Sequence, residues 1–180
     1  MSPKNMHAYV AGLLLLTGLS SAFMVAPLLP PDTDWTEYNG DGAKSHYSPL
    51  RQIHKRNVRQ LQVAWVYSSG GADTVRNRTQ MQCNPIVIDG VLYGVSANTQ
   101  AFALHAATGK EIWKTKLKDN GGTTSRGLTY WAQGRDKRIF LGAGKWLYAF
   151  DALTGQAIMG FGEKGRIDLQ QGVSRPGADN

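Results

Sequence analysis

The chain has 180 residues, of which 42% are hydrophobic and 9% aromatic, a composition that excludes a disordered protein and suffices for one domain with a core. Its formal charge of +7 raises the question of a nucleic-acid partner, but the densest basic run, RQIHKRNVR at residues 51–59, has no interleaved aromatic residue and no reading motif. This run therefore predicts a solvated face and no nucleic-acid site. The 21 glycines, together with the aromatic residues, predict short strands joined by tight turns.

The first element in chain order is an uncharged run over residues 8–30, which is predicted to form an apolar helix. Its LLLL core is followed by small residues, a pattern typical of a secretory signal peptide cleaved after Ala22. The 23 residues from 8 to 30 also suffice to span a bilayer, so an uncleaved signal-anchor is the alternative. Residues 1–30 are thus interpreted as a signal peptide or signal-anchor. Residues 31–180 are interpreted as a periplasmic or secreted domain, which the same segment would anchor to the inner membrane if it is not cleaved.

Two segments that lie 46 residues apart resemble each other. Each reads A-Φ-x-A-x-T-G, where Φ is a large apolar residue, and they begin at Ala103 and Ala149. A weaker echo places Trp65 48 residues before Trp113. A period in the forties is typical of β-propellers, in which each repeat supplies one antiparallel blade. The alternative is a β-sandwich with a chance internal resemblance.

Each repeat predicts a strand, a turn and a second strand. Residues 91–93 and 138–141 are the expected strands ahead of the two Thr-Gly turns, where glycine tolerates a positive φ. A tryptophan such as Trp113, at the end of the last strand, can lie flat between neighbouring blades and bury a large apolar area. A helical interpretation fails because no stretch after residue 31 keeps a 3.6-residue period for long, although residues 58–65 are compatible with a short helix or turn.

A polar tripeptide, Gln82-Cys83-Asn84, stands directly before a proline and a predicted strand. Cys83 is the one cysteine of the chain, so it forms no intrachain disulfide and has no CxxC partner for structural zinc. It is therefore predicted to be a buried, inert thiol. No histidines stand at metal-ligand spacing, and no metal ligand is assigned.

In the order and spacing of its motifs, the chain resembles the N-terminal part of the quinoprotein dehydrogenases that use pyrroloquinoline quinone (PQQ), of the glucose, quinate and alcohol type. The resemblance runs from about residue 34 to residue 168, and any one of its landmarks alone is weak. The landmarks are Trp35, Tyr38-Asn39-Gly40-Asp41, Tyr47-Ser48-Pro49-Leu50, Asn57-Val58, Ala64-Trp65, the QCNP stretch at 82–85, the two repeats, Arg126-Gly127-Leu128-Thr129-Tyr130 and Phe161-Gly162.

This resemblance implies an eight-bladed propeller of four-stranded antiparallel blades, of which the chain holds about two to three. It also implies PQQ near the central axis, with a Ca²⁺ ion touching the quinone in the full-length protein. In such a fold the first strand of each blade lines the central channel. Residues directly before that strand are then expected at the channel mouth, beside the cofactor.

Two residues match cofactor-binding positions of the family. Gln82 stands where relatives carry Glu or Gln, and its amide can bond a quinone carboxylate or carbonyl without a charge clash. Its alternative role is to cap loose backbone groups at the strand's start. Arg126 matches the family arginine that contacts the cofactor, and a guanidinium binds carboxylate in a bidentate fork. Its alternative role is a surface salt bridge, and no catalytic residue is assigned.

The function that the resemblance implies is oxidation of a sugar, cyclic polyol or alcohol, with electrons passing to a respiratory acceptor such as ubiquinone or cytochrome c. The family's catalytic Asp base and its Ca²⁺ ligands are expected beyond residue 180, so the chain is expected to be an inactive N-terminal part of a longer enzyme. Several alcohol-oxidising relatives carry adjacent cysteines over the quinone, and their absence here favours the sugar or cyclic-polyol branch. A non-catalytic propeller scaffold of the cell envelope and a truncated pseudoenzyme are the alternatives.

Overall fold

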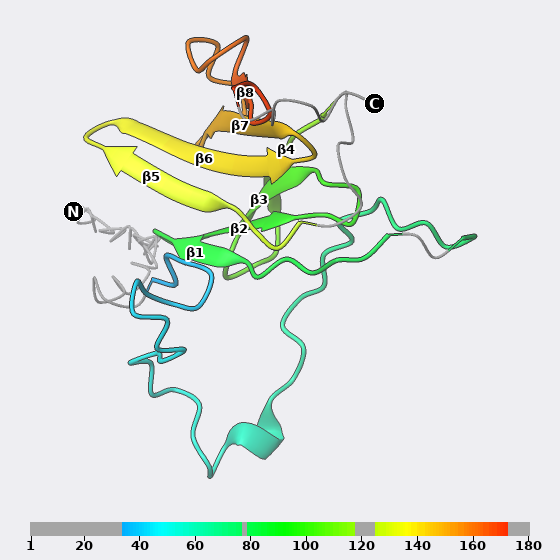
Figure 1. Ribbon diagram of the computed structural model, residues 1–180. Coiled ribbons are helices and arrows are strands. Elements are labelled where there is room, and N and C mark those ends of the chain that lie inside the picture. Colours follow the sequence, from blue (N-terminus) through cyan, green and yellow to red (C-terminus); the bar gives the residue numbers. More distant parts are fainter. Residues whose placement is uncertain (1–33, 77–78, 118–124, 173–180) are drawn as a thin grey trace, which may run out of the picture.

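The computed structural model describes residues 34–76, 79–117 and 125–172. Within these ranges the chain forms two four-stranded antiparallel sheets, each made of consecutive strands, and the sheets lie one above the other (Figure 1). The predicted all-β class with four-stranded units is confirmed. The first sheet contains β1 (Ile86–Ile88), β2 (Val91–Val95), β3 (Ala101–His105) and β4 (Glu111–Lys114), and the second contains β5 (Thr129–Gln133), β6 (Asp136–Ala143), β7 (Trp146–Asp151) and β8 (Arg166–Asp168).

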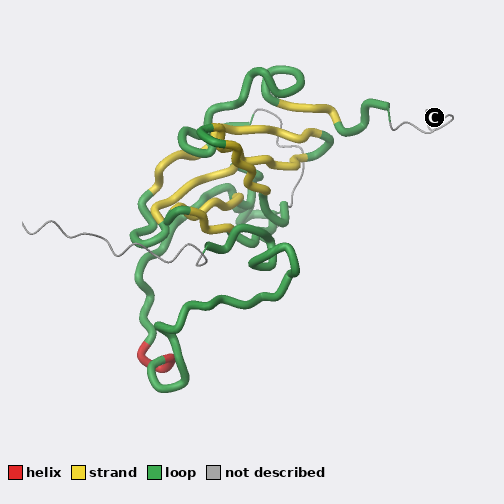
Figure 2. The backbone as a smooth tube through the Cα atoms, turned by 90° about the vertical axis from the view of Figure 1, so that its left-hand side faces the viewer, coloured by secondary structure: helices red, strands yellow, loops and turns green. Residues whose placement is uncertain are grey.

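The chain ahead of the first sheet includes a long loop that projects away from both sheets (Figure 2). At its far end lies a 3₁₀ helix, η1 (Val58–Gln60), the one helical element of the described residues, so the expected short helical turn is confirmed. The apolar helix predicted over residues 8–30 falls outside the described ranges. Within those ranges, no helix combines the length and the hydropathy needed to cross a bilayer.

The core lies between the two sheets and follows the two-residue alternation of their strands. Tyr93 and Val95 on β2 belong to the same buried cluster as Ile139 and Leu141 on β6. Aromatic rings also contact each other in this cluster. The centre of the Tyr93 ring lies 6.0 Å from the centre of the Trp113 ring on the same sheet. The other buried members of the cluster are Ile86, Ile88, Ala101, Ala103, Leu128, Ala143, Tyr148, Phe150 and Ala152.

The two A-Φ-x-A-x-T-G segments form the same turn. The Gly109 N–H donates to the carbonyl of His105 across 2.8 Å, and the Gly155 N–H donates to the carbonyl of Asp151 across 2.8 Å. Both glycines have a left-handed φ, +68° and +70°, which costs a residue with a Cβ roughly 1–2 kcal/mol. The predicted Thr-Gly turns are therefore confirmed, and glycine is required at both positions.

A tryptophan from the first sheet covers the turn of the second. Trp113 on β4 donates its indole N–H to the carbonyl oxygen of Ala152 across 2.9 Å, and its side chain is 8% exposed. The ring lies so close to Gly155 that a Cβ on this residue would stand 2.7 Å from it. The expected indole packing between neighbouring units is thus confirmed at Trp113.

Trp65 repeats this contact on the first sheet. Its indole N–H donates to the carbonyl of Ala106 across 3.0 Å, and a Cβ on Gly109 would stand 2.5 Å from its ring. The neighbouring Tyr67 ring lies 5.0 Å from Phe102, on the face of the first sheet that turns away from the second. The weak echo in the sequence therefore marks a real structural repeat, although residues 61–69 carry no assigned strand.

Replacing Gly155 by alanine is expected to lower the free energy of unfolding by about 2–5 kcal/mol, because the new Cβ adds a clash with a buried indole to the left-handed strain. Gly134→Ala is the matched control: Gly134 has a φ of +59° but nothing within 4 Å of its Cβ position, so only the strain of about 1–2 kcal/mol applies. Urea denaturation measures both losses. Equal losses of unfolding free energy in the two variants would show that the indole contact does not contribute to stability.

Replacing Tyr148 by phenylalanine is expected to raise the free energy of unfolding by about 1 kcal/mol, because the Tyr148 hydroxyl is buried and has no hydrogen-bond partner. Phe102 already stands 46 residues earlier, at the equivalent position of the first sheet. Tyr67→Phe is the control, since the Tyr67 hydroxyl donates to Glu111 and its removal is expected to destabilise the protein. A loss of stability in Tyr148→Phe contradicts the prediction.

Candidate functional site

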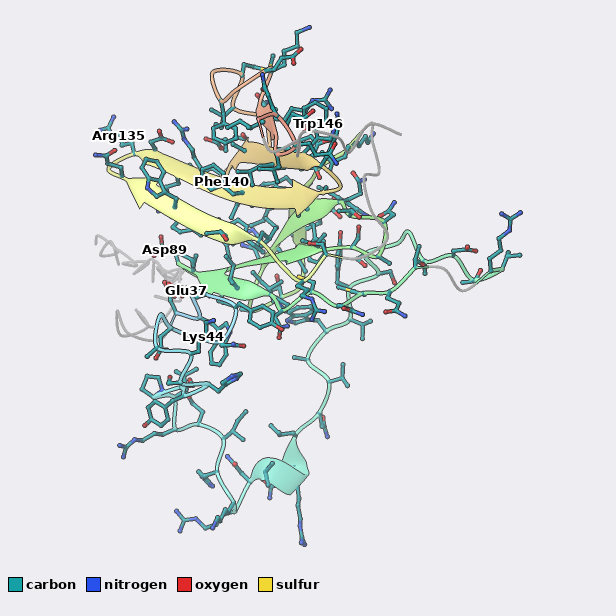
Figure 3. The ribbon with its side chains drawn as sticks, viewed as in Figure 1. Glu37, Lys44, Asp89, Arg135, Phe140 and Trp146 are labelled. Carbon is teal, nitrogen blue, oxygen red and sulfur yellow. The ribbon has the colours of Figure 1, made fainter. Side chains whose placement is uncertain are left out.

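The two segments that carry Gln82 and Arg126 lie side by side. In an antiparallel meander, the residues before the first strand, the turn between the second and third strands and the residues after the fourth all lie at one end of the sheet. The Asn84 N–H donates to the carbonyl oxygen of Arg126 across 3.0 Å, which brings the entrances of β1 and β5 together. Figure 3 shows Asp89 and Arg135, on the turns that follow these strands, at the opposite end from Trp146.

The Arg126 side chain is exposed, and its guanidinium makes no ion pair or hydrogen bond to any described residue. Gln82 is also exposed, and its amide nitrogen donates to the side-chain oxygen of Gln80 across 2.6 Å. Gln82 thus caps no backbone group among the described residues, and Arg126 has no salt-bridge partner there. A guanidinium without a described partner and a side-chain amide, carried on neighbouring segments, suit a ligand with carboxylate and carbonyl oxygens.

Cys83 anchors its segment to the first sheet. The sulfur accepts a hydrogen bond from the Val95 N–H across 3.2 Å, and the side chain packs against the core while remaining half-buried. Burial raises the pKa of the Cys83 thiol, and the hydrogen bond from Val95 offsets this only in part. At neutral pH the thiol is therefore poorly nucleophilic. The predicted burial of Cys83 is wrong in degree, because its segment enters the sheet from the exposed end and leaves the side chain half-buried.

A frame of buried polar side chains supports this end of the first sheet. Ser96, Thr99, Gln100 and Thr115 are the four buried polar residues in the described part of the chain. The side-chain oxygen Oε1 of Gln100 accepts from the Leu117 N–H across 2.8 Å, and the Thr115 hydroxyl accepts from the Ala101 N–H across 2.9 Å. These bonds fix the β2–β3 turn next to the Cys83 segment. Two of these residues, Gln100 and Thr115, also line a surface depression.

Sequence reasoning did not find this frame. Its one local signal is the polar Ser-Ala-Asn-Thr-Gln stretch at 96–100 between two apolar strands. Thr99 has a φ of +64°, a strained conformation for a β-branched residue, and it is 2% exposed. Neither the strain nor the burial can be inferred from the residue type. Strained backbone of this kind is found most often near functional sites.

Two shallow depressions on the described surface are lined by neither Gln82 nor Arg126. One, of about 530 Å³, is lined mainly by the β2–β3 turn and residues 114–117, and the other, of about 500 Å³, by residues 50–56. The described residues also contain no group of three or more His, Cys, Asp and Glu side chains able to hold a metal ion. Gln82 and Arg126 therefore stand at exposed positions outside both depressions.

The comparison with protein families matches residues 35–179 to the PQQ model described as "Glucose/ethanol/alcohol dehydrogenase, beta-propeller domain". The chain is 33% identical over 159 residues to the glycerol dehydrogenase large subunit of Gluconobacter oxydans (strain 621H), covering 80% of this chain and 21% of that protein. It is 31% identical over 166 residues to quinoprotein glucose dehydrogenase A of Acinetobacter calcoaceticus, covering 78% of this chain and 21% of that protein.

The structural comparison agrees with the sequence comparison. A quinohemoprotein alcohol dehydrogenase from Pseudomonas putida HK5 matches with a TM-score of 0.63 and 26% identity, over 77% of this chain and 19% of that chain. The chain thus spans about a fifth of the length of the relatives that it matches. The two four-stranded sheets are therefore propeller blades. The chain belongs to the PQQ-dependent glucose/ethanol/alcohol dehydrogenase family and forms part of its β-propeller domain.

Proposed function

We propose that this chain is the N-terminal portion of a PQQ-dependent dehydrogenase that oxidises a sugar, a cyclic polyol or an alcohol. The observation that carries the proposal is the hydrogen bond between Asn84 and Arg126, because it places Gln82 and Arg126 on neighbouring segments at one end of two adjacent blades. The whole enzyme passes its electrons to a respiratory acceptor such as ubiquinone or cytochrome c. It works in the periplasm or outside the cell, after export directed by the apolar run at residues 8–30.

Within this chain, Arg126 and Gln82 bind and orient the cofactor. PQQ carries three carboxylates, and the guanidinium of Arg126 has no described partner, so it is available for a bidentate bond. The amide of Gln82 donates to, or accepts from, a polar group of the ring system without adding a charge. When bound, PQQ supplies the two-electron oxidation of the substrate carbon. The proton-accepting Asp and the Ca²⁺ ligands belong to other parts of the longer protein.

Arg126→Ala is expected to weaken PQQ binding about 10- to 100-fold, the equivalent of one charge-assisted bidentate contact. The dissociation constant of Arg126→Lys is expected to lie between those of the wild type and of Arg126→Ala, because the lysine ammonium keeps the charge but cannot make a bidentate bond. The control is Arg135→Ala, since Arg135 is exposed on the β5–β6 turn at the opposite end (Figure 3). Equilibrium dialysis measures the dissociation constants. Unchanged binding in Arg126→Ala would remove this residue from the site.

The 180-residue chain mixed with PQQ and Ca²⁺ is expected to bind the quinone but not to reduce a redox dye with glucose, quinate or small alcohols. The physical reason is that this chain supplies cofactor contacts and neither the base nor the metal ligands. The same assay with a full-length relative of the family serves as the positive control. Dye reduction by the chain alone would overturn the proposal that it is an inactive portion, and absence of quinone binding would favour a scaffold role.

A further inference from the structure

The two cofactor-facing segments are joined by a backbone bridge rather than by their side chains. The bridge is the 3.0 Å hydrogen bond from the Asn84 N–H to the Arg126 carbonyl. We propose that this bridge, which only a glycine at position 127 permits, positions the Arg126 guanidinium relative to Gln82 for quinone binding. The inference rests on the proposed function, and it assigns a positioning role to Gly127 and to the backbone of Asn84.

Each side of the bridge is separately fixed to its own sheet. On the first sheet, the Cys83 sulfur accepts from the Val95 N–H across 3.2 Å. On the second sheet, the Leu128 side chain is 8% exposed and belongs to the core cluster. A link between two anchored segments sets the distance between them. Because Arg126 supplies the accepting carbonyl, the same residue carries both the bridge and the proposed cofactor contact.

Gly127 makes the bridge possible in two ways. Its φ is +154°, a region that side-chain-bearing residues rarely adopt. A Cβ at this position would also stand 3.3 Å from the Asn84 carbonyl oxygen, which is closer than ordinary van der Waals contact. An alanine there must push the Asn84 segment away by a few tenths of an ångström or turn the peptide that follows Arg126. Either change re-aims the guanidinium, and binding geometry tolerates displacements of only about 0.5 Å.

Gly127→Ala tests the proposal with two measurements on the 180-residue chain. Amide hydrogen exchange by NMR is expected to be faster at Asn84 while the core strands keep their protection. Equilibrium dialysis is expected to show PQQ binding weakened about tenfold, a change of about 1.4 kcal/mol. Gly134→Ala is the matched control, because Gly134 is also left-handed but has nothing near its Cβ position. Its strain lowers stability in general, so the exchange rate of Asn84 relative to the core strands and the dissociation constant of PQQ should both stay unchanged. Asn84→Pro removes the N–H donor directly; if Gly127→Ala does not fold, it replaces that variant in the dialysis measurement, where weakened PQQ binding is again expected.

A double-mutant cycle separates positioning from general stability. If Gly127 acts through Arg126, the Gly127→Ala change has little further effect on quinone binding once Arg126 is already alanine. Additive losses, or an unchanged dissociation constant in Gly127→Ala, would overturn the inference while leaving the proposed function intact. A wild-type chain that binds no PQQ would overturn the proposed function and the positioning role together, whereas the Asn84 exchange rate still reports whether the bridge exists.

Discussion

The packing of the Trp113 indole on Gly155 is the contact on which the arrangement of the two sheets depends. A buried tryptophan removes 150–250 Å² from water, which at about 25 cal/mol per Å² stabilises the fold by roughly 4–6 kcal/mol as an upper estimate. The hydrogen bond from its indole N–H to Ala152 adds about 1 kcal/mol. Burial thus supplies the strength of the contact. The hydrogen bond supplies its direction, because it fixes which residue of the next turn lies beneath the ring.

This contact determines where the candidate site forms. With the second sheet held on the first by Trp113, the entrances of β1 and β5 come within hydrogen-bonding distance at Asn84 and Arg126. The salt bridge between Lys137 and Asp89, 2.9 Å long, joins the sheets at the other end, but its exposed partners contribute at most about 1 kcal/mol. The apolar contact is therefore the principal constraint, and the polar bridge at the site depends on it.

The sequence alone was sufficient to predict the structural features that depend on local residue types. The Thr-Gly turns, the strands at 91–93 and 138–141 and the packing of Trp113 all follow from residue types at fixed spacing. The second repeat departs from this regularity, because Met159 stands where the first has Trp113 and is 64% exposed. There the outer strand β8 begins only at Arg166, after an isolated bridge at Ala157. A period alone cannot locate such an insertion.

The candidate site was predictable only in part, for a physical reason. The residue types of Gln82 and Arg126 predict a ligand with carboxylate and carbonyl oxygens. The closeness of their segments, however, depends on how the two sheets stack, because 42 residues of chain separate Asn84 from Arg126. Likewise, the left-handed φ of Thr99 and the positive φ of +154° at Gly127 arise from tertiary context, which overrides local preference. Contacts between segments that are distant in the sequence can be identified only from the packing of the two sheets.

Trp65 shows why a longer propeller accounts for this chain better than a self-contained domain does. It docks on Gly109 as Trp113 docks on Gly155, and Trp113 lies in the outer strand of the preceding sheet. By the same relation, residues 61–68 correspond to an outer strand, yet in the described chain they pair with no other strand, and Val63 and Val66 are 80% and 83% exposed. Apolar side chains along an unpaired strand need partners to cover them. Further blades of the proposed enzyme would supply those partners.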